Sequence, residues 1–448
     1  MKWKIFYFCI PVLLSAPVIV YKYYELGDAK RLFFWGLAAL MILVVSSLFI
    51  NKGKIYSRLA IGIASVLIYI FIIGFTCEFM NWSYDVFSIF KDYGFPAYIS
   101  ADYKSYNWAT SNPRLSKVYL LKLDSISYDY SLKPCTRSLL IVQNDTLVYE
   151  KYYNGAKQNH AFQIASVTKS IISALVGLAI KHKYIDSVNQ CFMDYFPEYK
   201  KTVASDKLSI TIHNLLTMQG GWKEEWGYGY DWVKAFIYYP LVYKTGEQFY
   251  YSSQQPFLLS AIISKAYGKP TSEFMMEYLF KPLGINYAYW WKSPNGIEQG
   301  GIGLYMTARD LARFGNLYIN NGKVGDTRLI SKEWITKSTT NYKKNKFSWG
   351  LNGYGYLWWL DEIEGLKTNI ALGYVGQYIV NLPDLKMTIV TTADWFYKEK
   401  AGNDNAAFIY NHIKDIVSLF KKQSVENAPE TIKYLNKAQA PKLVIKSE

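Results

Sequence analysis

The stretch Gln163-Ile-Ala-Ser166-Val-Thr-Lys169-Ser-Ile-Ile-Ser-Ala-Leu-Val places a serine and a lysine three residues apart at the start of an apolar run. The run predicts a helix from Ser166 to about His182, on which Ser166 and Lys169 share one face. A helix N-terminus carries free backbone N–H groups and a partial positive field. A serine hydroxyl is a weak nucleophile that needs a base, and a partly desolvated lysine beside it can serve.

The same Ser-x-x-Lys spacing occurs twice more, at Ser88-Ile-Phe-Lys91 and at Ser418-Leu-Phe-Lys421. By itself the spacing also describes a solvated lysine beside a helix-capping serine. Ser88 lies in an aromatic, irregular stretch. Ser418 lies near the end of a predicted terminal helix, where the helix dipole has the wrong sign to assist a nucleophile. The surroundings therefore favour Ser166 over Ser88 and Ser418 as the candidate nucleophile.

Three apolar runs before residue 80 predict a membrane region. They are Ile5–Tyr21, Leu32–Ile50 and Leu59–Cys77. The last two carry no charge and approach the roughly 20 residues that cross a bilayer. The start of the chain resembles the n-region of a signal peptide, but it has no clear cleavage site, so we expect an uncleaved helix. The distribution of Lys and Arg places the N-terminus inside, which makes this an integral protein of the cytoplasmic (inner) membrane with everything after about residue 80 on the extracytoplasmic side.

The composition excludes a disordered chain and gives no indication of nucleic-acid binding. Aromatic residues make up 18% of the 448 residues, and the formal net charge is +15. The aromatic content requires a large core or membrane contact. The basic residues form no basic helix and no patch interleaved with aromatic residues. We therefore interpret the charge as a solvated basic surface and expect no nucleic acid as a partner.

Cysteine and histidine residues give no metal-ligand pattern. The four cysteines lack metal-type spacing, and two of them lie in the apolar runs. A disulfide between Cys135 and Cys191 is one possibility, and two buried free thiols are the favoured one. A G-x-S-x-G sequence is missing, so a Ser-His-Asp hydrolase lacks its usual anchor. We expect no metal and no organic cofactor.

Beyond the apolar runs, the pattern of turns and apolar segments predicts an α/β (α+β) fold. The expected parts are a membrane region over 1–80, a connector over 81–134, a folded domain over 135–422 and a polar tail over 423–448. Strand patterns lie at both ends of the folded domain, and helical patterns lie between them. This order predicts a sheet layer with a helical insertion over about 185–345 and a cleft between the two. The expected elements are a hairpin turning at 144–145, helices over 166–182, 210–218, 256–267, 271–283, 307–321 and 404–420, and strands over 377–383 and 387–393.

Three motifs follow one another along the chain: Ser166-Val-Thr-Lys169, Gly246-Glu-Gln-Phe-Tyr-Tyr251-Ser-Ser253 and Gly373-Tyr-Val-Gly376-Gln377. Their order and spacing resemble the serine β-lactamase and penicillin-binding-protein superfamily. The sequence between them is similar to the class C-like branch, above all to family VIII-type esterases and aminohexanoate-oligomer hydrolases. The matching stretches are Leu215-Leu-Thr-Met, Pro282-Leu-Gly, Gly301-Ile-Gly-Leu-Tyr-Met-Thr-Ala-Arg-Asp310-Leu-Ala-Arg-Phe-Gly and Tyr356-Leu-Trp-Trp359. The resemblance covers about residues 135–420 and implies an antiparallel sheet flanked by helices.

The resemblance also implies roles for the motif residues. Ser166 would attack an ester, amide or lactam carbonyl to give an acyl-enzyme. Lys169 would orient Ser166 and help to take its proton, and Tyr251 would relay that proton to the leaving group. The backbone N–H groups of Ser166 and Gln377 would hold the oxyanion, and Gly376 would let the strand approach the substrate.

Two motif positions depart from the pattern of β-lactamases and carboxypeptidases. Ser253 stands where the second motif ends in Asn, and Tyr374 stands where the third motif begins with Lys or His. That cation ordinarily helps to receive a substrate carboxylate, whereas a tyrosine donates one hydrogen bond and brings no charge. The departures favour a less charged acyl substrate.

The sequence thus predicts a membrane-anchored serine hydrolase that cleaves a small-molecule or peptide ester or amide through an acyl-enzyme on Ser166. One alternative is a penicillin-binding-protein-like D-alanyl carboxypeptidase or β-lactamase. Another is a non-catalytic protein of the same fold that binds an envelope ligand. The oligomeric state stays open.

Overall fold

The computed structural model of the protein describes residues 98–100, 108, 117–223, 231–343, 350–395 and 402–426. All of them belong to one compact unit, Pro96–Glu448. The three predicted membrane runs, the Ser88 motif and most of the predicted polar tail lie outside the described residues. None of the helices in the described part is both long enough and apolar enough to cross a bilayer.

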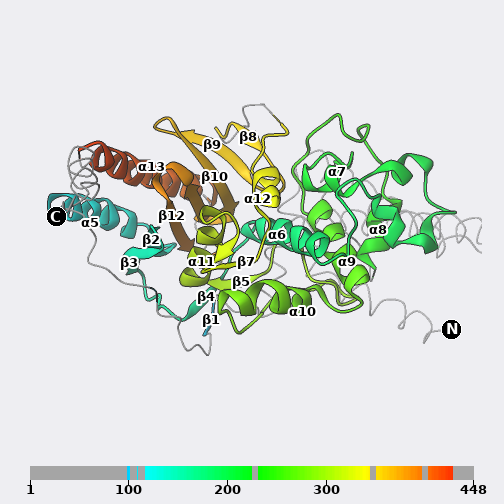
Figure 1. Cartoon of the computed structure of the whole chain (residues 1–448), viewed down its shortest axis with the longest axis horizontal. Coiled ribbons are helices and arrows are strands. Elements are labelled where there is room, and N and C mark those ends of the chain that lie inside the picture. The colour runs from blue at the N-terminus through cyan, green and yellow to red at the C-terminus, as the bar shows by residue number, and fades with distance from the viewer. Residues whose placement is uncertain are drawn as a thin grey trace, which may run out of the picture. The chain divides into compact units, whose positions relative to one another are not determined.

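A seven-stranded antiparallel sheet is the main layer of the unit, with the strand order β3-β2-β12-β11-β10-β9-β8 (Figure 1). Its strands are β2 (Thr136–Gln143), β3 (Thr146–Tyr152), β8 (Gly353–Tyr354), β9 (Trp359–Ile363), β10 (Leu366–Gly373), β11 (Gln377–Leu382) and β12 (Met387–Ala393). The first hairpin turns at Asn144 and Asp145, whose φ angles of 50° and 59° are those of a tight two-residue turn. The sheet is therefore built from the two ends of the domain sequence, as the strand pattern predicted.

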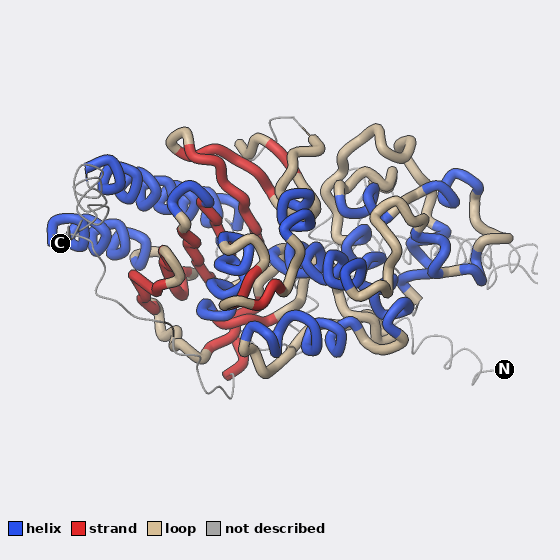
Figure 2. Tube along the Cα trace, viewed as in Figure 1, coloured by secondary structure: helices blue, strands red, loops and turns tan. Residues whose placement is uncertain are grey.

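Helices pack on the sheet (Figure 2). Other helices lie in the part of the sequence between the strands β2 and β3 and the strands β8 to β12. The helices are α5 (Lys117–Ser131), α6 (Val167–Lys181), α7 (Ile212–Leu216), α8 (Trp232–Tyr238), α9 (Gln254–Tyr267), α10 (Thr271–Met275), α11 (Ala308–Ile319), α12 (Lys332–Ser338) and α13 (Gly402–Glu426). Short 3-10 turns accompany them at Phe192–Tyr195, Pro197–Tyr199, Ser205–Ser209, Lys281–Leu283, Tyr374–Gly376 and Pro383–Leu385.

Strand β11 shows why the sheet is buried on both faces. A Cβ on Gly315 of α11 would lie 2.7 Å from the Ile379 side chain, so that helix packs closely on one face. The next residue back, Tyr378, stacks on Tyr410 of α13 and donates from its hydroxyl to the Ala406 carbonyl at 3.0 Å. Because neighbouring residues of a strand point to opposite faces, α11 and α13 cover opposite sides of the sheet.

A second, three-stranded sheet leads the chain into the Ser166 motif. It has the order β1-β4-β5, with β1 (Tyr98–Ser100), β4 (His160–Gln163) and β5 (Tyr305–Thr307). A further two-stranded ribbon joins β6 (Lys323–Val324) to β7 (Thr327–Arg328). Strand β1 comes from the predicted connector, as does α5, and both belong to this compact unit.

The predicted elements agree with the structure where the sequence signal is local. The hairpin at 144–145, the helix after Ser166 and the helix closed by Gly268 are confirmed. The predicted helix over 271–283 instead divides into α10, one π turn (Met276–Phe280) and a 3-10 turn. Cys135 and Cys191 are both free thiols. The antiparallel sheet flanked by helices is confirmed, whereas the predicted membrane helices lie outside the described residues.

Candidate active site

Ser166 is the N-cap residue of α6, the helix that its sequence predicts. The chain enters from β4 and turns at Ala165, whose φ of 50° is rare for a residue with a side chain. The side-chain oxygen of Gln163 accepts a hydrogen bond from the Ala165 N–H and so holds this turn. The Ser166 hydroxyl makes no capping hydrogen bond to its own helix and stays half-buried. It is therefore available to a substrate.

Lys169 lies one turn further along α6, with a side chain that is only 2% exposed. Its Nζ atom donates to Ser166 Oγ at 3.0 Å, to Ser253 Oγ at 3.1 Å and to the Gly301 carbonyl at 2.9 Å. An ammonium group has three N–H donors. These three acceptors therefore match the full donor capacity of a protonated lysine and fix its head beside the serine.

Glycines at 300 and 301 allow the backbone to reach Lys169. A Cβ on Gly301 would lie 2.6 Å from the Cβ of Ser253, and one on Gly300 would lie 1.9 Å from the Pro256 carbonyl oxygen. Neither contact is possible for a larger residue without a shift of the backbone or of α9. Close packing of this turn on the start of α9 thus sets the position of the Gly301 carbonyl.

Tyr251 and Ser253 come from the segment that leads into α9. The Lys169 Nζ atom lies 4.8 Å from the centroid of the Tyr251 ring. The ring also packs on Trp359, with a centroid separation of 5.2 Å. Tyr354, 6.2 Å away, is fully buried, and burial raises its pKa well above the usual value, so it stays neutral. The structure therefore brings Ser166, Lys169, Tyr251 and Ser253 together.

The third motif lies at the turn between β10 and β11. A Cβ on Gly373 would lie 2.6 Å from the Ile164 carbonyl oxygen and 3.0 Å from the Ala165 Cβ, so this residue contacts the turn before Ser166. Gly376, with a φ of 105°, instead faces α13, where a Cβ on this residue would lie 2.2 Å from Ile409 Cδ1. The Gln377 amide is buried and pairs with the backbone of Ala393 on β12. Gly373 is thus the part of the motif that meets the nucleophile segment, while the Gly376 position and the Gln377 side chain serve the packing of the sheet.

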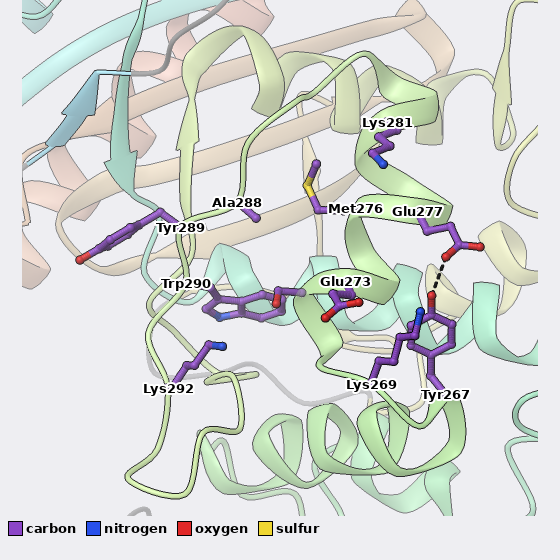
Figure 3. Close-up of a pocket in the computed structure, with 11 residues that line it drawn as sticks. Tyr267, Lys269, Glu273, Met276, Glu277, Lys281, Ala288, Tyr289, Trp290 and Lys292 are labelled. Atoms are coloured by element: carbon purple, nitrogen blue, oxygen red, sulfur yellow. Dashed lines mark hydrogen bonds between the residues drawn. The ribbon is translucent and has the colours of Figure 1, made fainter.

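A cavity of about 520 Å³ lies between α10 with its following π turn and an extended segment (Figure 3). Figure 3 shows Trp290 and Lys292 on the extended segment, with Glu273 and Glu277 on the helical side. The Trp290 indole N–H donates to the carbonyls of Gln299 at 2.7 Å and Ile302 at 3.1 Å. Since these two residues flank Gly301, the cavity wall also holds the segment that contacts Lys169.

A buried carboxylate ties the two walls of this cavity together. Glu298 is fully buried and accepts from the Thr271 N–H at 3.1 Å and the Ser272 hydroxyl at 2.6 Å, both on α10. Lys292 lies 3.3 Å from the same carboxylate. The lysine side chain is about half exposed, so solvent screens this ion pair, and the two buried hydrogen bonds contribute most.

We expect Glu298→Gln to lower the free energy of unfolding by about 1–3 kcal/mol, because the amide turns an N–H donor toward groups that themselves donate. Thermal denaturation of the full chain measures this change. The matched control is Glu362→Gln, at an exposed position of β9, which should leave the melting temperature unchanged. Equal melting temperatures for the two variants would show that Glu298 does not hold this frame.

The sequence pointed to the serine, the lysine and the tyrosine, but it did not reveal the backbone that surrounds them. The Gly301 carbonyl and the contact made by Gly373 were missed. Their only signal was the glycine-rich composition of both segments.

His160 and His213 lie elsewhere: His160 Nδ1 accepts from the Lys157 N–H at 3.3 Å, and His213 Nδ1 pairs with the Tyr356 hydroxyl at 2.9 Å. Within the described ranges, no group of His, Cys, Asp and Glu side chains could hold a metal ion.

Comparison with known proteins gives one family over most of this unit. The family described as Beta-lactamase matches residues 137–412. The 6-aminohexanoate-dimer hydrolase of Paenarthrobacter ureafaciens is 23% identical over 300 residues, which cover 58% of this chain and 73% of that protein. A provisionally named D-alanyl-D-alanine carboxypeptidase of Escherichia coli O157:H7 is 21% identical over 295 residues, covering 48% of this chain and 68% of that protein.

Solved structures show the same fold. The octameric penicillin-binding protein homologue of Pyrococcus abyssi superimposes with a TM-score of 0.52 at 21% sequence identity, and the match covers 66% of this chain and 77% of that one. The D-amino acid amidase of Ochrobactrum anthropi superimposes with a TM-score of 0.54 at 15% identity, covering 69% of this chain and 100% of that one.

Proposed function

This chain belongs to the beta-lactamase family of serine hydrolases, and from that premise we propose that it cleaves an ester or amide through an acyl-enzyme on Ser166. The observation that carries the proposal is the contact of 3.0 Å between the buried Lys169 Nζ and Ser166 Oγ. A nucleophile at a helix N-terminus beside a buried lysine is an arrangement for acyl transfer. Tyr251 completes the group that moves the proton.

In the first half of the reaction, Ser166 Oγ bonds to the substrate carbonyl carbon. Because Lys169 donates to Ser166 Oγ, the hydroxyl hydrogen of Ser166 points elsewhere, and Tyr251 is the acceptor we propose for it. The positive charge of Lys169, 4.8 Å from the Tyr251 ring, favours a phenolate there. The C–O or C–N bond of the substrate then breaks, and the leaving alcohol or amine takes the proton back from Tyr251.

In the second half, water attacks the carbonyl carbon of the acyl-enzyme and gives one proton to Tyr251. Tyr251 passes this proton to Ser166 Oγ as the bond from Oγ to the acyl carbon breaks, which releases the acid and restores Ser166. Both tetrahedral intermediates need donors for their oxyanion. We propose the backbone N–H of Ser166 and one from the third motif. The backbone N–H of Gln377 is the one expected for this second role. A Cβ on Gly373 would lie 2.9 Å from the Gln377 Cβ as well as 2.6 Å from the Ile164 carbonyl oxygen, so this end of the motif borders the turn before Ser166.

The third motif favours an ester or amide whose acyl part is uncharged. Tyr374 brings no positive charge to the position where a cation would receive a substrate carboxylate. The Arg137 cation is already paired with Asp394, the residue after β12, at 2.8 Å. These features argue against a substrate with a C-terminal carboxylate, which a D-alanyl carboxypeptidase requires.

We also propose that the unit is anchored by the apolar runs before residue 80 and faces the extracytoplasmic side. The support is the length of those runs and the distribution of Lys and Arg around them. This placement gives the enzyme envelope or external substrates.

A single labelling experiment tests the chemistry and the location. Intact cells that make the full chain are treated with a membrane-impermeant fluorophosphonate, and the labelled peptide is mapped. We expect the label on Ser166, because the activated hydroxyl displaces fluoride from phosphorus. Labelling only after lysis would contradict the location and leave the chemistry standing. Failure to label Ser166 in lysed cells as well would overturn the proposed function.

A further inference from the structure

An exposed aromatic side chain belongs to the third motif. Tyr374 is 44% exposed, although it directly follows Gly373, which packs on the turn before Ser166. A tyrosine ring is large and apolar, and leaving it in water at a packed site has a cost unless something covers it. Its position makes the substrate the natural candidate.

The Tyr374 ring is the outer end of a row of three aromatic side chains. Its centroid lies 6.3 Å from that of Trp395, and Trp395 lies 5.6 Å from Trp291. Both tryptophans are buried, at 6% and 3% exposure, so they form a fixed backing for the tyrosine. Rings at these separations attract one another through their edges and faces.

Both ends of this row are tied to the catalytic group. At one end, Gly373 contacts Ile164 and Ala165, next to Ser166. At the other end, the backbone N–H of Trp291 donates to the Gly303 carbonyl at 3.0 Å, and a Cβ on Gly303 would lie 2.7 Å from the Trp291 Cβ. Gly303 is two residues from Gly301, the acceptor of Lys169. The aromatic row therefore follows one side of the Ser166–Lys169 pair.

We propose that this row is the acyl-binding wall of the enzyme, and that the preferred substrates carry an uncharged aromatic acyl group that packs on Tyr374. The inference rests on the proposed function and gives it a substrate class. The chemistry fits, because Tyr374 offers a ring face and no charge, and because the Asp394 carboxylate next to Trp395 is neutralised by Arg137. An acetyl group is too small to cover the ring, and a carboxylate-bearing acyl group finds no cation on the row.

The test compares 4-nitrophenyl esters of acetic, phenylacetic and succinic acids, with kcat/KM values of the full chain divided by the rates of hydroxide hydrolysis. We expect phenylacetate to exceed acetate by about tenfold or more, the scale of one good aromatic contact. Tyr374→Ser should lower that ratio of phenylacetate to acetate by about tenfold. Tyr374→Phe, which keeps the ring, should retain the preference. Tyr128→Ser, at an exposed tyrosine of α5, is the control and should change neither rate.

The outcomes separate this inference from the function beneath it. Turnover of acetate without a preference for phenylacetate overturns the aromatic wall and leaves the serine hydrolase standing. The same holds if Tyr374→Ser keeps the preference for phenylacetate. It also holds if the succinate ester is the best substrate and Tyr374→Phe loses that preference, because the Tyr374 hydroxyl would then donate a hydrogen bond to the substrate carboxylate. Absence of turnover on all three esters, together with an unlabelled Ser166, contradicts the proposed function itself.

Discussion

Ser166→Ala is expected to lower kcat/KM on any ester substrate by about four orders of magnitude or more, because the acyl-enzyme can no longer form. The substitution removes one oxygen atom from a half-buried position that makes no capping bond to α6. We therefore expect the melting temperature to stay close to that of the wild type. Steady-state kinetics and thermal denaturation of the same preparation measure the two effects.

The matched control is Ser173→Ala, at a fully buried serine on the same helix. It should fold and turn over substrate like the wild type, since its hydroxyl lies outside the catalytic group. Ester turnover in Ser166→Ala that equals that of the wild type would place the nucleophile elsewhere. Loss of activity in both variants would point to damage of α6 rather than to loss of a nucleophile.

Lys169→Met is expected to lower kcat/KM by about a thousandfold, within the range that one proton-transfer group contributes. The side chain has nearly the same length, so the loss reports the amine and its charge. Removing it leaves the Gly301 carbonyl without this donor, which costs about 1–3 kcal/mol. Burying an ammonium costs several kcal/mol, and the mutation relieves this term. We therefore expect stability to stay the same or rise while activity collapses.

Lys207 provides the matched control, because it is a second buried lysine whose ammonium group binds backbone carbonyls at the end of α8. It is 2% exposed and donates to the carbonyls of Ile237, at 2.7 Å, and Tyr239. Burial lowers the pKa of Lys207. Lys207→Met should keep full activity. If Lys169→Met loses activity only in proportion to lost folded protein, its role is structural and the proposed proton path is wrong.

Local signals accounted for most of what the sequence predicted correctly. The helix that carries Ser166 and Lys169 follows from an apolar run and from the helical repeat, which brings residues three apart to one face. The hairpin at Asn144 and Asp145 follows from two residues that tolerate positive φ. Strands β9 and β10 were not predicted, because polar residues interrupt Trp359–Ile363 and Leu366–Gly373 and leave no regular alternation.

Backbone contacts around the site required the structure. At position 376 the backbone has a positive φ, and a Cβ would collide with the Ile409 side chain. Packing on α13 therefore explains the glycine at this position. A motif written in letters cannot distinguish that use from a close approach to substrate. Likewise, only the structure shows that the side-chain amide of Gln377 is held by the backbone of Ala393, whereas the oxyanion role expected of its backbone N–H stays a prediction.

The sequence by itself determined that Ser166 and Lys169 meet, because three residues along a helix is a distance fixed by backbone geometry alone. It also determined the family, through motifs whose order survives low identity. Only the tertiary structure decided what surrounds the pair. The partners of Lys169 at Ser253 and Gly301 lie 84 and 132 residues away in the chain, and Gly373 and the Tyr374 row come from the far end of the domain. Such contacts depend on how sheet and helices pack, and packing is a property of the whole core rather than of any local stretch.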